Sequence, residues 1–130
     1  MGLHDRNKRG FKRLLKSFYY ATQGLGHVFK HEQNMNIHVV VAALIIISAY
    51  LLDLPLTHWL ILLIVIAGIF ALEIMNTAVE RTVDLVTKDY HPMAKLAKDI
   101  AAAAVFVYCV FAVVIGLIIF IPPLLHLLNL

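Results

Sequence analysis

Charged residues are scarce in this chain: Asp, Glu, Lys and Arg make up only 15% of its 130 residues, whereas 62% are hydrophobic. Soluble domains average about 25% charged residues, because they need polar surface to face water. The scarcity therefore excludes the large soluble catalytic folds, such as dinucleotide-binding domains and (β/α)8 barrels. The composition indicates an all-α integral membrane protein.

Cysteine is nearly absent as well. The single Cys109 lies inside an apolar run, which excludes a disulfide framework and gives no sign of a thiol nucleophile beside a base. The glycine-rich patterns GxxxxGK[ST] and GxGxxG are also missing. Any nucleotide must therefore be held by something other than a phosphate-binding loop of the soluble kind.

Three apolar runs approach the length of a bilayer crossing, which takes about 20 residues. They cover residues 37–52, 59–72 and 100–125, and the second reaches spanning length only if its helix continues through Glu73. The third run closes at Pro122, a residue that commonly ends a helix. We predict transmembrane helices over 37–54, 59–84 and 97–121.

The basic residues set the predicted orientation. Seven of the eleven Lys and Arg residues precede the first run, and the other four lie between the second and third runs. The segments 53–58 and 126–130 contain none. Because basic flanks stay in the cytoplasm, we expect a cytoplasmic N-terminus, three crossings and an external C-terminus.

The N-terminal segment is amphipathic at helical spacing. Apolar residues fall on one side, and basic or polar residues on the other: Phe11, Leu14, Leu15, Phe18, Leu25 and Phe29 against Lys12, Arg13, Lys16 and Gln23. We expect residues 1–34 to form a helix on the anionic cytoplasmic surface of the membrane. A simple membrane anchor is the alternative interpretation.

Polar residues interrupt the second crossing in a regular pattern. Glu73, Asn76, Glu80 and Asp84 are spaced so that all four fall within an arc of about 80° on one helix face. An ionisable residue near hydrocarbon costs about 3 kcal/mol, so this face must meet protein, water or cations. The alternative is that the helix simply frays here into a solvated loop, which is acceptable for Asp84 alone.

Carboxylates at this density suggest a hard divalent cation. Mg²⁺ takes one or two carboxylates together with phosphate oxygens, which makes phosphoryl transfer a candidate reaction. Glu73 is the deepest carboxylate and is placed to accept a proton from a lipid hydroxyl at the headgroup level. Glu32 could add a carboxylate from a second helix, and Lys98 could meet phosphate.

Two histidines offer a weaker metal hypothesis. His27 and His31 are four residues apart with Glu32 adjacent, a permissible spacing for a transition metal. The HExxH motif is not formed, because Met35 stands at its last position.

Two long stretches resemble the signature of the prokaryotic diacylglycerol kinase family. They are residues 73–84, EIMNTAVERTVD, and residues 94–105, AKLAKDIAAAAV. The N-terminal part is similar to the Gram-positive branch of the family, whose members are typically undecaprenol kinases; the matching positions are Gly10, Phe11, Arg13, Tyr20, Gly24, Leu25, Lys30, His31, Glu32, Asn34, Asn36, Ile37 and His38.

The resemblance implies a homotrimer of three-span protomers, each with a surface helix, in the bacterial inner membrane. It implies transfer of the γ-phosphate of ATP, with Mg²⁺, to a membrane alcohol. Nucleic acid is not among the expected partners.

The resemblance also assigns roles by position. Glu73 matches the general base, Glu32 and Glu80 match metal-binding carboxylates, and Asn76 and Asp84 match supporting positions of the same face. The positions that match nucleotide-binding residues are Arg13, Tyr20, Glu32, Glu80, Asp89, Tyr90, His91, Lys98 and Asp99.

One departure bears on the substrate. Thr22 and Gln23 stand where diacylglycerol-specific relatives carry tryptophan and lysine, which favours undecaprenol as the acceptor. Diacylglycerol, giving phosphatidic acid, is the alternative. The rivals outside the kinases are a small proton-coupled transporter, in which Glu73 would carry the proton, and a membrane subunit without chemistry.

Overall fold

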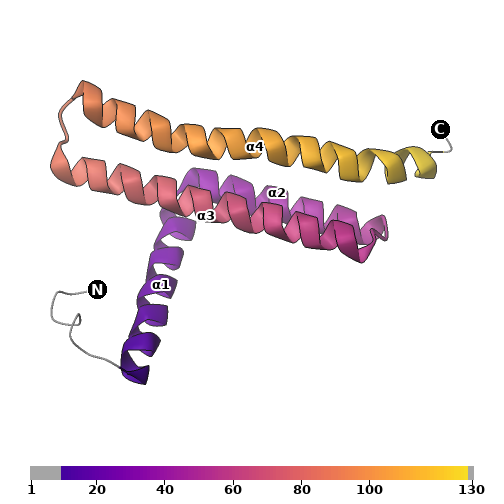
Figure 1. Cartoon of the computed structure of the whole chain (residues 1–130), viewed down its shortest axis with the longest axis horizontal. Coiled ribbons are helices and arrows are strands. Elements are labelled where there is room, and N and C mark those ends of the chain that lie inside the picture. The colour runs from indigo at the N-terminus through magenta and orange to yellow at the C-terminus, as the bar shows by residue number, and fades with distance from the viewer. Residues whose placement is uncertain (1–9, 129–130) are drawn as a thin grey trace.

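The computed structural model describes residues 10–128, and the chain within that range is helical. The helices follow in the order α1 (Phe11–His31), α2 (Gln33–Leu51), α3 (Leu56–Val86) and α4 (Pro92–Leu127). Figure 1 shows α2, α3 and α4 lying alongside one another, with α1 leaving the bundle at a steep angle. The prediction of an all-α membrane protein is confirmed, since α2, α3 and α4 are long and apolar enough to cross a bilayer.

The turn between α2 and α3 comes earlier in the chain than predicted. Helix α2 ends at Leu51 rather than at residue 54, because Asp53 adopts a left-handed backbone with a φ of 48°. Aspartate tolerates this conformation better than most residues. Pro55, with its φ of −66°, then stands at the N-cap of α3.

Helix α4 extends past both predicted ends. It starts at Pro92 instead of residue 97, because proline suits the first turn of a helix and His91 caps it. At the other end the helix continues through Pro122 and Pro123 to Leu127, so the expectation that it stops at 121 is wrong. The fixed φ of proline is itself helical, and each proline gives up only one helical hydrogen bond.

Helix α1 covers the central part of the predicted surface helix. The predicted residues 1–9, with their basic side chains Arg6, Lys8 and Arg9, lie outside the described residues. Glu32 is extended, with φ −102° and ψ 116°, and is the one residue that separates α1 from α2. Phe29 of α1 packs edge-to-face on Phe70 of α3, with 6.2 Å between ring centroids. These contacts fix the base of α1 against the bundle.

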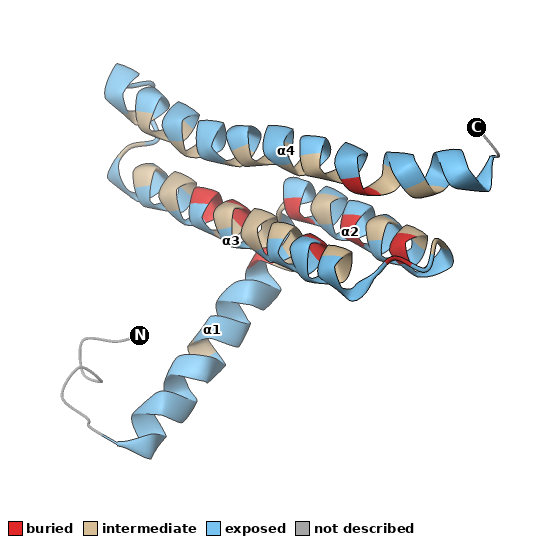
Figure 2. Ribbon diagram, turned by 45° about the vertical axis from the view of Figure 1, so that its right-hand side comes forward, coloured by how far each residue is buried: buried red, intermediate tan, exposed pale blue. Residues whose placement is uncertain are grey.

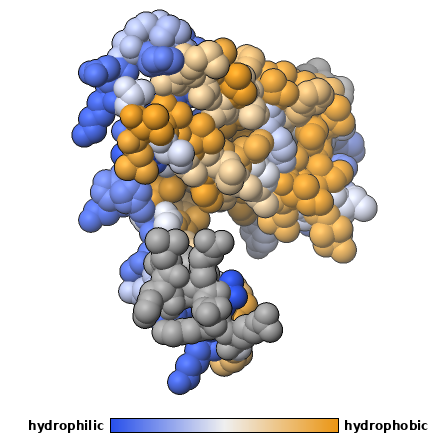
Figure 3. All heavy atoms as spheres, turned by 60° about the vertical axis from the view of Figure 1, so that its left-hand side comes forward, coloured by the Kyte–Doolittle hydropathy of each residue, from blue (hydrophilic) through white to orange (hydrophobic). Residues whose placement is uncertain are grey.

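The interior of the bundle is small. Helix α3 packs chiefly against α4 and then against α2. A core cluster gathers near the α2–α3 turn; its buried members are Ala49, Leu54, Leu62 and Ile119. Most other large apolar side chains are exposed, as the blue ribbon of Figure 2 and the orange surface of Figure 3 show. This surface needs lipid or another protein to cover it.

An apolar cavity of about 580 Å³ lies between α2, α3 and α4. Its lining is almost entirely aliphatic and aromatic, with His38 and Ser48 of α2 and Cys109 of α4 as the exceptions. The cavity runs along the membrane-spanning part of the bundle, on the side of α3 that also carries Phe70.

A close contact joins α3 to α4 in the middle of the bundle. The Tyr108 hydroxyl donates a hydrogen bond to the Ile64 carbonyl at 3.3 Å. To do so the ring passes over Gly68, where a Cβ atom would clash with the hydroxyl oxygen. The missing side chain of Gly68 is therefore what admits Tyr108.

We expect Gly68→Ala to destabilise the protein, because the added methyl group displaces Tyr108. Overpacking of this kind costs about 1–3 kcal/mol, which exceeds the gain of about 1 kcal/mol from replacing a helical glycine. The measurement is thermal unfolding in detergent. Gly116→Ala is the matched control, since a Cβ there meets nothing within 4 Å and should stabilise α4 slightly. A Gly68→Ala protein that melts at or above the unsubstituted protein would refute the contact.

Candidate active site

The polar face of α3 is buried in the protein at the end that carries Glu73. Glu73 is 3% exposed, Asn76 7% and Thr77 5%. Glu80, one turn further on, is half-buried, and Asp84 is exposed. Because α3 continues unbroken to Val86, the alternative of a fraying helix is wrong for Glu73 and Asn76. The face therefore changes gradually from buried to exposed along about three turns.

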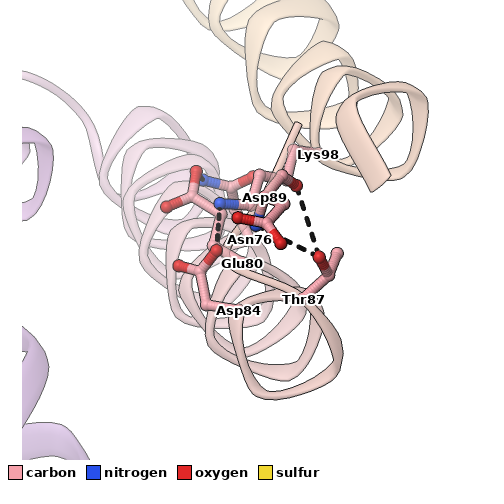
Figure 4. A network of polar contacts seen from close by, with 6 residues as sticks. All are labelled: Asn76, Glu80, Asp84, Thr87, Asp89 and Lys98. Carbon is pink, nitrogen blue, oxygen red and sulfur yellow. Dashed lines mark hydrogen bonds and ion pairs between the residues drawn. The ribbon is translucent and has the colours of Figure 1, made fainter. Parts of the chain in front are cut away.

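The side chain of Asn76 connects this part of the face to Glu80, one helical turn further along. Its amide nitrogen donates a hydrogen bond to Oε1 of Glu80 at 3.1 Å (Figure 4). Its Oδ1 atom is buried and has no hydrogen-bond partner in the described part of the chain. A buried amide oxygen without a partner is costly, so this position is one where a donor from a bound molecule would be stabilising.

The exposed end of the face meets α4. Nζ of Lys98 lies 2.5 Å from Oδ1 of Asp84, so the structure brings the predicted phosphate-binding lysine onto the α3 carboxylates. Asp99, in contrast, pairs with Lys95 on its own helix. These pairs lie where α3 ends and α4 begins, the region drawn in Figure 4.

Glu32 reaches the same helix from the α1–α2 junction. Its Oε1 accepts a hydrogen bond from Nη2 of Arg81 at 2.8 Å. Glu32 therefore lies against α3, and its contribution to the site stays a prediction. The sequence indicates Arg81 only as a basic residue that flanks the membrane, because its separation of 49 residues from Glu32 leaves no local pattern.

The loop between α3 and α4 is shaped by its own side chains. The backbone N–H of Asp89 donates to Oγ1 of Thr87 at 3.1 Å. Nδ1 of His91 accepts from the backbone N–H of Met93 at 3.2 Å, which caps α4. Tyr90 is exposed. His91 thus has a structural part that its predicted role at the nucleotide did not anticipate.

Two predicted nucleotide-binding residues lie apart from this cluster. Arg13 is in the first turn of α1, at the end farthest from the bundle (Figure 1). Tyr20 lies in the middle of α1, where its ring packs against that of Tyr19 with 5.8 Å between centroids. Within one chain, neither is brought to the polar face of α3.

The carboxylates fit Mg²⁺ in their chemistry. No three His, Cys, Asp or Glu side chains among residues 10–128 converge as a ready-made metal cage. Mg²⁺ does not need one, because it commonly takes one or two carboxylates and fills its other positions with water and phosphate. Glu32 and Glu80 are the two side chains that would hold it.

The histidine hypothesis receives no further support. The rings of His27 and His31 stack with 4.4 Å between centroids, and Nδ1 of His31 lies 2.9 Å from the His27 carbonyl oxygen. One ring nitrogen is thereby used by the helix backbone, and a third ligand is lacking within the described ranges.

Comparison with known sequences identifies the family. Residues 19–120 match the sequence profile described as "Prokaryotic diacylglycerol kinase". The chain is 42% identical over 118 residues to the "Undecaprenol kinase" of Bacillus subtilis, which covers 91% of this chain and 96% of that protein. It is 40% identical over 115 residues to a "Diacylglycerol kinase" of Synechocystis, covering 88% and 66% of the two chains. The corresponding Escherichia coli protein, also named "Diacylglycerol kinase", is 30% identical over 108 residues, covering 83% and 88%.

The matched region contains all of α2 and α3, most of α4 and the greater part of α1. It therefore includes Glu73, the Asn76–Glu80 pair, and the two basic side chains that pair with carboxylates at this end of the bundle, Arg81 and Lys98. The resemblance drawn from the motifs is confirmed, and the chain belongs to the prokaryotic diacylglycerol kinase family.

Proposed function

We propose that this protein is an ATP-dependent lipid kinase that phosphorylates undecaprenol to undecaprenyl phosphate at the cytoplasmic face of the bacterial inner membrane. The observation that carries the proposal is the position of Glu73: a buried carboxylate on an apolar helix, one turn above Asn76 and two above Glu80. A proton-coupled transporter would not need the carboxylates to continue outward to Asp84, which forms an ion pair with Lys98.

Undecaprenol is favoured over diacylglycerol by the relative with 42% identity, which is named an undecaprenol kinase and matches over nearly its whole length. The relative in Synechocystis, at 40%, is named a diacylglycerol kinase, which keeps phosphatidic acid synthesis as the second candidate. The apolar cavity beside α3 suits the tail of either lipid.

In the proposed reaction the carboxylate of Glu73 takes the proton of the lipid hydroxyl. The hydroxyl oxygen forms a bond to the γ-phosphorus of ATP as the bond between that phosphorus and the β–γ bridging oxygen breaks, giving phosphorylated lipid and ADP without a phosphoenzyme. Bound Mg²⁺ supplies charge neutralisation on the phosphates. Glu32 and Glu80 hold it, Asn76 orients Glu80, and Lys98, with Asp84 as its partner, meets phosphate.

The remaining nucleotide contacts are assigned to α1 and to the α3–α4 region: Arg13, Tyr20, Asp89, Tyr90, His91 and Asp99. Those on α3–α4 lie close to the polar face along the chain. Those on α1 do not reach it within one protomer, which supports a site completed by a second copy. The exposed apolar surface of the bundle likewise supports an oligomer, and we propose a homotrimer.

Helix α1 is proposed to lie on the cytoplasmic membrane surface. Its exposed apolar residues, such as Phe11, Leu14 and Phe18, would rest in the headgroup region. The ends of α3 and α4 that meet at their connecting loop extend beyond the base of α1 (Figure 1), so they would project into the cytoplasm. This arrangement gives a cytoplasmic N-terminus and an external C-terminus, with Glu73 near the lipid side and Asp84 near the aqueous side.

The direct test is transfer of labelled γ-phosphate from ATP, with Mg²⁺, by protein in detergent micelles. We expect faster transfer to undecaprenol than to diacylglycerol presented at equal mole fraction. Preference for diacylglycerol would overturn the substrate while keeping the reaction. Transfer to neither lipid would overturn the kinase.

Replacing the base should abolish most activity without disturbing assembly. We expect Glu73→Gln to lower kcat by at least about 10²-fold, because the amide cannot take the hydroxyl proton. Asp53→Asn, the same change of carboxylate to amide in the turn at the opposite end of α3, is the control and should leave kcat unchanged. Near-normal turnover of Glu73→Gln would contradict the assignment.

The metal-binding carboxylates should show in a Mg²⁺ titration. Glu80→Gln and Glu32→Gln are each expected to raise the Mg²⁺ concentration needed for half-maximal activity, because each removes a hard anionic ligand. The titration is run at saturating lipid and at a fixed concentration of ATP, with Asp53→Asn again as the reference. An unchanged requirement in both variants would argue against these residues as ligands.

A further inference from the structure

Glu32 directs its side chain away from the helix that it starts. It is the N-cap of α2, yet its side chain makes no capping hydrogen bond to that helix. The carboxylate instead reaches across to α3 and accepts a hydrogen bond from Arg81, whose Nη2 lies 2.8 Å away. Its side chain is 21% exposed, and that of Arg81 is 58% exposed. The side chain of Glu32 thus joins the α1–α2 junction to α3 through an ion pair between distant segments.

Arg81 lies among the carboxylates of the proposed site. It directly follows Glu80 on α3 and precedes Asp84 by one turn. Glu32 is the carboxylate that its guanidinium contacts, through Nη2. The guanidinium of Arg81 therefore brings a permanent positive charge to Glu32 from a position between Glu80 and Asp84 along α3.

Both proposed metal ligands are already occupied by donors of the chain. Arg81 donates to Glu32, and Asn76 donates to Glu80. The two cases differ in charge: the amide of Asn76 is neutral, whereas the guanidinium of Arg81 competes with a cation for the same carboxylate. Only the Arg81 contact has to weaken when a divalent ion approaches Glu32.

We propose that Arg81 is a positioning residue that acts as the resident counter-ion of Glu32, holding the α1–α2 junction against α3 until a divalent cation competes for that carboxylate. This inference rests on the proposed function, because it takes Glu32 as a ligand of the metal. It adds an intramolecular competitor that lowers the apparent affinity of the site for metal.

Metal binding by the full chain in detergent, without nucleotide, tests the inference. Mn²⁺ replaces Mg²⁺ as the probe, and the electron paramagnetic resonance signal of free Mn²⁺ gives the bound fraction. We expect Arg81→Gln to lower the dissociation constant for Mn²⁺ about two- to fivefold, the range that a partly exposed ion pair represents. Arg81→Lys keeps the charge but loses the planar guanidinium group. Its dissociation constant for Mn²⁺ should therefore lie between those of the unsubstituted chain and Arg81→Gln.

Lys88→Gln is the matched control, because it removes one positive charge just beyond α3, in the exposed loop, without a role assigned at the site. If the effect came from net charge alone, Lys88→Gln would change the affinity for Mn²⁺ as much as Arg81→Gln does. Circular dichroism and thermal unfolding in EDTA establish that each variant is folded. A merely structural role of Arg81 would lower the melting temperature without tightening Mn²⁺ binding.

The outcomes separate this inference from the proposed function. Tighter binding in Arg81→Gln, beyond that in Lys88→Gln, supports the counter-ion. Equal or weaker binding in Arg81→Gln, with normal binding in the unsubstituted chain, overturns it and leaves the kinase intact. If the unsubstituted chain binds no Mn²⁺, or if Glu32→Gln binds it as well as the unsubstituted chain does, the assignment of Glu32 as a ligand fails and this inference fails with it. Tight binding without lipid phosphorylation overturns only the kinase.

Discussion

The burial of Glu73 is the constraint on which the rest of this structure depends. A carboxylate at the edge of a hydrocarbon layer is too costly to face lipid, so the chain must cover one side of α3 while leaving its other sides apolar. The helix achieves this by keeping its polar residues on one narrow face and packing that face toward the protein. The proposed site at the membrane surface rests on this face, which passes from buried to exposed within a few turns.

The charged partners of this face come from both neighbouring segments. Lys98 is contributed by α4. This helix begins soon after Val86, because the connecting loop is short and His91 caps the first turn of α4. Glu32 arrives from the α1–α2 junction because a single extended residue separates those helices and points its side chain at Arg81. The packing of three segments thus brings Glu32, Lys98 and the polar face of α3 to one end of the bundle.

The spans and the polar face were predictable from the sequence, because they depend on apolar run length and helical spacing alone. The ends of the helices were less predictable: the turn at Asp53 ends α2 earlier than predicted, and Pro122 and Pro123 continue α4 instead of ending it. The contact between Arg81 and Glu32 was out of reach, since a pair 49 residues apart depends on how α1, α2 and α3 pack. The same holds for the space that Gly68 leaves for Tyr108.

The depth of the polar face in the membrane is the central claim, and spin labels on α3 measure it. Replacing Cys109 leaves a cysteine-free chain, and labels at Met75 and Leu85, which are 61% and 88% exposed, report on the levels of Glu73 and Asp84. In bilayers, the label at Met75 should be relaxed more by oxygen, which concentrates in lipid, and the label at Leu85 more by a water-soluble nickel complex. Equal environments at the two positions would contradict a site that straddles the membrane surface.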